Sequence, residues 1–130
     1  MARSPSPADA RSRVVFDLHS PALAVVSLIG DHDLTTSDAL DQALVRAAAA
    51  RQRHVLVDLS ACTFIDSTVI EAFLHARARV EAQNGRFGLI IPDPTTPPAR
   101  AIALIRLHEV MPILASLEAL DLSATAATAT

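Results

Sequence analysis

The stretch VLVDLSACTFIDSTVIEAFLHA, residues 55–76, decides the fold because it joins a buried strand to an amphipathic helix. HVLVDLS (54–60) is a short apolar run, typical of a central strand. ACTFI (61–65) is predicted to be a connection that still carries residues of the buried type. The next segment is predicted to be a helix from Asp66-Ser67 to about Asn84-Gly85. Its apolar stripe has helical spacing and consists of Val69, Phe73, Ala76 and Val80, widened by Ile70 and Leu74.

The flanking segments extend this pattern in both directions. Two strands, 14–19 and 23–29, form a predicted hairpin, and a helix with the apolar positions Leu40, Ala43, Leu44 and Ala47 follows a Thr36 or Ser37 cap. After the central segment we expect a strand at 86–91, a helix from Ala99 to about Leu107, a short strand at 111–115 and a last short helix capped by Ser116. This order predicts an α/β fold with a mixed four- to five-stranded sheet, parallel in its later part, and helices mainly on one face.

The chain has 130 residues, which suits one domain, predicted at 13–122 between disordered tails at 1–12 and 123–130. A net charge of -3 gives no electrostatic footprint for nucleic acid. The chain lacks lysine and a GxGxxG pattern, which excludes Schiff-base chemistry and a dinucleotide loop of that type. Cys62 is expected to be a small buried hydrophobe. No signal peptide or membrane span is recognised, so a cytoplasmic location is expected.

An enzymatic function is not expected, and we assign no catalytic residue, metal ligand or cofactor. The five histidines have no metal-binding spacing and are expected at the surface or at strand ends. Ser67 does not lie in a GxSxG motif. His75 follows on the same helix, roughly 12 Å away at the helical rise, and cannot be its general base. Asp58 has no imidazole between it and the serine.

Ser67 at the start of a helix supports two readings. A hydroxyl at or near the N-cap accepts a backbone N–H as a purely structural cap. Alternatively, Ser67 is a phosphorylation site, because the amides and the positive dipole end of the helix accommodate an added dianion. The phosphate would then change the outer surface, including Asp66 and Asp33, and repel a docked partner. The exposed face is predicted to comprise Asp33, Asp66, Ser67 and Glu71.

Residues 55–76 resemble the signature of the STAS domain family, typified by anti-sigma factor antagonists. The family has a strand ending in DLS and then an aliphatic-Asp-Ser-Ser-Gly-Leu step into a helix. GDHDLTTSDAL (30–40) is similar to its Gly-acid-aliphatic-Asp turn, with His32 at the aliphatic position. FGLIIPDPTTPPARAIALIRLHEVMPILASLEAL (87–120) is similar to its later strand, proline-containing loop and terminal helices, with Leu107-His108 in place of a Gly-Leu. Thr68-Val69 stands where the family has Ser-Gly.

The resemblance implies partner switching in a bacterial cell. The unmodified protein would bind an anti-sigma factor, itself a serine kinase of the histidine-kinase-like ATPase type, which phosphorylates it; a phosphatase would reset it. It implies Ser67 as the phosphoacceptor, with Thr68 secondary. The implied partner-binding residues are Gly30, Asp31, Asp33, Asp66, Ser67, Thr68 and Glu71.

No nucleic acid partner or membrane insertion is expected, and the protein is expected to be a monomer or weak dimer. The alternative is a STAS-like regulatory or scaffolding subunit of a transporter or signalling complex that does not use phosphate.

Overall fold

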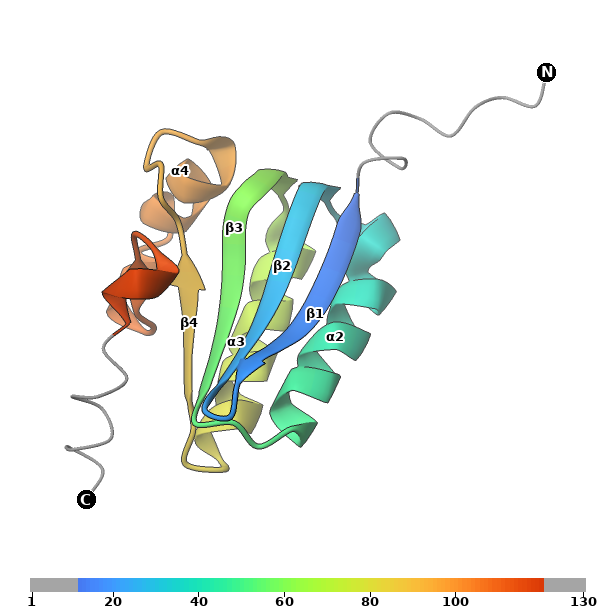
Figure 1. The fold of residues 1–130 in the computed structure, drawn as a ribbon. Helices are drawn as coiled ribbons and strands as arrows, with labels where there is room; N and C mark the ends of the chain where they lie inside the picture. The colour runs from blue at the N-terminus through green and yellow to red at the C-terminus, as the bar shows by residue number, and fades with distance from the viewer. Residues whose placement is uncertain (1–11, 121–130) are drawn as a thin grey trace.

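The computed structural model describes residues 12–120, so the predicted tails, apart from residue 12, and residues 121–122 of the predicted domain lie outside the described range. Five strands form one sheet in the order β1-β2-β3-β4-β5 (Figure 1). The strands are β1 (Arg13–Ser20), β2 (Leu23–His32), β3 (His54–Ile65), β4 (Arg86–Ile90) and β5 (Ile113–Leu114). β1 pairs with β2 in antiparallel fashion, whereas the later pairings are parallel. The predicted mixed sheet is confirmed.

Three α-helices connect the parallel strands, as the alternating pattern predicts. They are α2 (Ser37–Ala49), α3 (Ser67–Glu81) and α4 (Pro97–Leu104). Three short 3-10 helices complete the described chain: η1 (Leu34–Thr36), η2 (Leu107–Glu109) and η3 (Leu117–Ala119). Figure 1 shows α2 and α3 side by side behind the sheet. Within residues 12–120, no helix is long and apolar enough to cross a bilayer.

The main core lies between the helices and one face of the sheet. Alternate residues of β2, namely Ala24, Val26 and Leu28, point into it, because successive strand side chains face opposite sides. Phe73 of α3 and Phe87 of β4 meet there with ring centroids 6.4 Å apart. On the opposite face, a smaller buried cluster packs against the C-terminal turn and consists of Leu23, Val25, Leu56 and Ile90. The helices therefore cover mainly one face, as predicted.

β3 is longer than predicted, because ACTFI continues the strand. Two register shifts against β2 each insert one extra residue on the β3 side. As a result, the residues of β3 that point into the main core are first two and then three positions apart: Val55, Val57, Leu59, Cys62 and Ile65. The bulges break the period of two that identifies a strand in a sequence. Cys62 is buried, as expected, and burial raises the pKa of its thiol to about 11.

The helices differ from their predicted boundaries and faces in three places. Thr36 is the N-cap of α2, but its side chain makes no capping hydrogen bond there. In α3, Ala72 rather than Leu74 completes the buried stripe, and Leu74 is exposed. α4 ends at Leu104 instead of about Leu107, and the left-handed Arg106 separates it from η2. The short final helix is a 3-10 turn, which Ser116 caps as predicted.

Two histidines, His32 and His54, are buried, and both lie at strand ends, one of the two locations expected for the five histidines. His32, at the end of β2, is fully buried and its Nε2–H donates to the Ile29 carbonyl at 3.0 Å. Its Nδ1 lies 3.0 Å from Thr36 Oγ1. These two contacts allow an imidazole to occupy a core position, because both ring nitrogens have partners.

His54 begins β3 and is also buried, but its Nε2 has no hydrogen-bond partner. Burial, together with the nearby guanidinium groups of Arg86 and Arg53, lowers the pKa of His54 from its ordinary value of 6.5. Between this lowered pKa and the ordinary value of 6.5, the imidazole is mostly protonated in the unfolded chain and mostly neutral in the folded chain. The unfolded chain therefore binds more protons in this pH range.

We predict that the free energy of unfolding decreases as the pH falls from about 7 to about 5, because protonation of His54 favours the unfolded chain. His54→Leu removes this group and leaves an apolar side chain beside Leu23, its partner in β2. In urea denaturation at several pH values, the variant should gain stability relative to the wild type as the pH falls. Parallel pH profiles would contradict this assignment.

Candidate functional site

The site is built where β2 and β3 end side by side. His32 and Ile65 are register partners in the parallel pair, and each is followed directly by an aspartate that caps the next helix. Asp33 and Asp66 therefore leave neighbouring strands at the same edge of the sheet. The structure therefore places Asp33 and Asp66 at the same edge as the start of α3, and their role in partner binding stays a prediction.

Asp66, not Ser67, is the N-cap of α3, which corrects the predicted serine cap. Its backbone is extended, and its carboxylate accepts hydrogen bonds from the backbone N–H groups of Thr68 (3.0 Å) and Val69 (3.3 Å). A carboxylate at this position also interacts favourably with the positive end of the helix dipole. The amides that were expected to accommodate a phosphate on Ser67 are thus already partly occupied.

Ser67 is the first residue of α3 and is exposed to solvent. Its hydroxyl makes no hydrogen bond to any other residue within the described range 12–120. Thr68 is half-buried, and its hydroxyl donates to the same Asp66 oxygen that binds the helix amides. Of the two candidate phosphoacceptors, only Ser67 has a hydroxyl that is both exposed and unengaged.

Val69 occupies the position at which the STAS signature has glycine. Its side chain is fully buried in the main core, beneath the first turn of α3. The β-branched group therefore points away from the surface that carries Ser67. Glu71 lies one turn after Ser67 and is exposed, as predicted.

Gly30 and Asp31 lie in β2 rather than in a loop, which corrects the predicted location. Gly30 is buried and adopts φ 84, a left-handed conformation that glycine tolerates at a bulge. The register shift that follows aligns Asp31 with Phe64, and Asp31 accepts a hydrogen bond from the Thr63 hydroxyl. Asp31 also accepts one from Ser12 through its carbonyl. Asp31 thus links the end of β2 to β3 by a hydrogen bond. Gly30 has no side chain to offer a partner.

The same Asp-x-Thr turn follows each of the three parallel strands that lead into a helix. Asp33, Asp66 and Asp93 each accept hydrogen bonds from the backbone N–H and the hydroxyl of the threonine two positions later. Bonds from Thr35 lower the pKa of Asp33, and bonds from Thr95 lower the pKa of Asp93. A D-x-T triplet after a buried run is the sequence signal that locates these turns.

Two exposed apolar residues lie beside the site, one in the middle of a turn and one near the end of β3. Leu34 is the counterpart of Ser67 in the β2–α2 connection, and 69% of its surface is exposed. Phe64, near the end of β3, is 45% exposed. Large apolar side chains exposed near a free hydroxyl favour a protein-contact surface. Sequence reasoning missed both residues, because each follows the apolar pattern of a strand end.

The comparisons with known proteins agree with this architecture. A family model described as "Mlab, STAS domain" matches residues 15–124. An anti-sigma factor antagonist from Mycobacterium paratuberculosis is 27% identical, with a TM-score of 0.71, covering 90% of this chain and 92% of that one. A STAS domain protein from Planctomyces limnophilus is 22% identical, with a TM-score of 0.65, covering 90% and 98%.

The phosphorylated form of the Bacillus cell fate determinant SpoIIAA has a TM-score of 0.61 at 16% identity, covering 91% of this chain and 100% of that one. No curated protein sequence matches the chain.

We predict that Asp66→Ala destabilises the protein by about 1 kcal/mol, because the first amides of α3 lose their acceptor. Asp66→Asn is the matched control and should retain most of the stability, since its amide oxygen still caps the helix. Urea denaturation of both variants measures the difference. Equal stability of Asp66→Ala and the wild type would show that the cap contributes nothing.

Val69→Ala should cost about 2 kcal/mol of unfolding free energy, because it removes two buried methyl groups and leaves a cavity. The exposed Glu71→Ala on the same helix should stay within about 0.5 kcal/mol of the wild type. Thermal and urea unfolding report both values. A neutral Val69→Ala would mean that this side chain is not part of the core.

Proposed function

The chain belongs to the STAS domain family, and from this premise we propose that it is an anti-sigma factor antagonist whose binding is controlled by phosphorylation of Ser67. Its partner is an anti-sigma factor that is also a serine kinase of the histidine-kinase-like ATPase type. The unmodified protein binds this partner, phosphorylation ends the interaction, and a phosphatase restores the binding form. The protein itself is a regulatory binding module and not an enzyme.

The observation that carries the proposal is the exposed, unengaged hydroxyl of Ser67 at the first position of α3. A kinase must place the acceptor oxygen in line with the γ-phosphate, so the oxygen has to be accessible. The neighbouring Thr68 hydroxyl is held by Asp66 and is half-buried. Transfer to Thr68 would require this hydrogen bond to break. Ser67 is therefore the principal acceptor.

The surroundings of Ser67 support a switch that acts on the surface. Leu34 and Phe64 supply exposed apolar area for a docked partner, and Asp33 and Asp66 supply negative charge. Phosphorylation adds about two negative charges. A dianion at this position must be desolvated when a partner docks and is repelled by any acidic group on it, so it opposes binding. Val69 does not obstruct the kinase, because its side chain lies in the core.

The experiment that tests the proposal uses the purified protein and the kinase-like anti-sigma factor encoded in the same genome. Wild-type protein and Thr68→Ala should each accept one phosphate in the presence of ATP, whereas Ser67→Ala should accept none by intact mass. In a binding assay, Ser67→Ala should bind the partner, and Ser67→Asp should bind about tenfold or more weakly, because the acid imitates the phosphate charge.

Two outcomes would overturn phosphorylation control. One is the absence of phosphate from Ser67 together with undiminished binding of Ser67→Asp, which would identify a STAS subunit that regulates or scaffolds its partner without phosphate. The other is phosphate on Thr68 in the Ser67→Ala variant at the wild-type rate, which would assign the acceptor to Thr68. Circular dichroism spectra of all variants establish that they are folded.

A further inference from the structure

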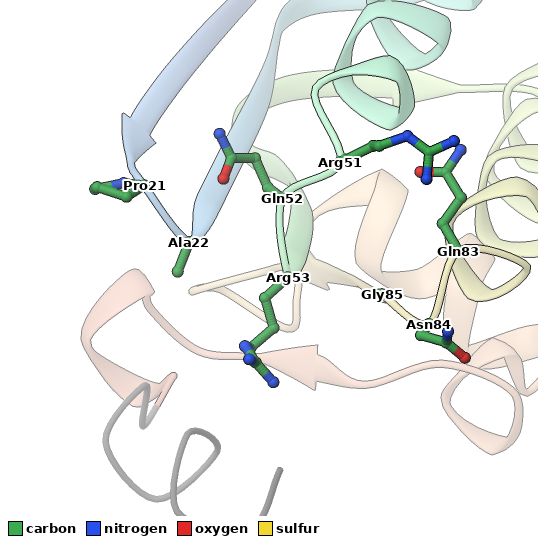
Figure 2. A pocket seen from close by; sticks show the side chains of 8 residues that line it. All are labelled: Pro21, Ala22, Arg51, Gln52, Arg53, Gln83, Asn84 and Gly85. Carbon is green, nitrogen blue, oxygen red and sulfur yellow. The ribbon is translucent and has the colours of Figure 1, made fainter. Parts of the chain in front are cut away.

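A pocket of about 490 Å³ lies at the end of the domain opposite Ser67 (Figure 2). Three connections line it: the β1–β2 turn, the α2–β3 loop and the α3–β4 turn. Ser67 follows the end of β3, whereas this pocket is formed by residues that precede β3 and β4. The lining residues are Pro21, Ala22, Arg51, Gln52, Arg53, Gln83, Asn84 and Gly85. The proposed phosphorylation switch uses none of them.

Backbone hydrogen bonds hold the three connections together. The His54 N–H donates to the Ala22 carbonyl at 2.9 Å, and the Arg86 N–H donates to the Arg53 carbonyl at 2.8 Å. Gly85 allows a close approach, because a Cβ there would lie 3.3 Å from the Gln52 carbonyl oxygen and 2.8 Å from a Val80 methyl. The pocket walls are therefore defined by the ordered backbone, and not by side chains alone.

The pocket carries positive charge without a counter-ion. Arg51 and Arg53 form no ion pair or side-chain hydrogen bond with any residue in the described range, and no acidic side chain lines the pocket. The ion pairs within residues 12–120 lie elsewhere, at Asp17–His19, Arg77–Glu81 and Arg106–Glu109. Arg86, the register partner of His54, does not line the pocket, but its charge, like that of Arg53, acts on His54. Such a set of cations favours an anionic ligand.

Arg51 has an unusual backbone for an arginine. It follows the end of α2 with φ 55, a left-handed conformation in which glycine is the common residue. Figure 2 shows its side chain extended toward Gln83, whereas Arg53 extends in a different direction, between Ala22 and Asn84 in this view. The two guanidinium groups therefore point toward different parts of the pocket.

We propose that this pocket binds a phosphorylated small molecule, with Arg51 and Arg53 contacting its anionic groups. Guanidinium groups bind phosphate oxygens through paired N–H donors, and the volume lies in the range of small-molecule sites. The side-chain amides of Gln83 and Asn84 provide donors and acceptors for an uncharged polar part of the ligand. A nucleotide and a glycerophosphate headgroup share this chemistry.

The test is an NMR titration of the full chain with ADP and, separately, with glycerol 3-phosphate. We expect saturable amide shifts at residues 51–53 and 83–85, and the ligand with the lower Kd identifies the source of the phosphate. Arg51→Gly with Arg53→Gln should raise the Kd about tenfold or more, since charge-assisted hydrogen bonds are lost. Glycine suits the left-handed backbone at position 51, so this variant should remain folded.

Arg100→Gln is the matched control, because Arg100 is exposed on α4 and does not line the pocket. It should bind both ligands as the wild type does. The proposal is overturned if neither ligand produces saturable shifts at about 0.15 M salt, or if Arg100→Gln weakens binding as much as the pocket variant does. It is also overturned if the pocket variant is less stable but shows the same ligand shifts as the wild type. The arginines would then stabilise the fold, by interacting with the carboxyl ends of α2 and α3, and would not bind a ligand. None of these outcomes depends on Ser67.

Discussion

The position of the site depends on the pairing of β2 with β3 and on the two bulges that β3 carries. Each bulge adds a residue to β3, and the buried positions shift accordingly from Leu59 to Cys62 and then to Ile65. Ile65 remains in the core, so the next residue, Asp66, leaves the sheet directly at the amino end of α3. The bond between Thr63 and Asp31 braces the same two strand ends. The exposure of Ser67 follows from this sequence of constraints.

The carboxylates of Asp33 and Asp66, at the ends of β2 and β3, stabilise the turns in which they lie, and this limits how they can take part in binding. Asp33 and Asp66 accept hydrogen bonds from backbone amides that would otherwise lack partners. Both therefore hold their turns and add negative charge at the same time. A phosphate on Ser67 would enter a region that is already acidic, and its effect would fall on whatever docks there. A rigid turn suits such a switch, because a partner can respond to the added charge without any rearrangement of the fold.

The fold could be predicted from the sequence where the hydrophobic period is regular. The apolar stripe of α2 and the continuous apolar run of β2 predict the helix and the strand in the observed order, because α2 buries one face and β2 is buried on both faces. Residues 61–65 could not be recognised as strand, since the bulges replace the period of two by spacings of three. His32 could not be placed in the core either, because its burial depends on contacts with Ile29 and Thr36 that only the folded turn provides.

The candidate site was predictable in outline and not in geometry. The Asp66-Ser67 step identified the helix start, but which side chain caps the helix depends on the extended backbone at Asp66. The resemblance to the STAS signature likewise indicated that Val69 stands in place of a glycine, whereas the direction of its side chain into the core required the packing of α3 on the sheet. The pocket at the opposite end had no sequence signal, because its residues come from three separate connections.

The most direct test of the proposed switch compares the NMR spectra of the unmodified and the Ser67-phosphorylated protein. If the phosphate alters a surface held by β2 and β3, amide shifts should be confined to the connections around residues 31–36 and 63–71. The amides of the core strands and of the 51–53 and 83–85 connections should not move. Shifts spread through the main core, or loss of the α3 signals, would contradict the account, because the switch would then act by refolding the domain.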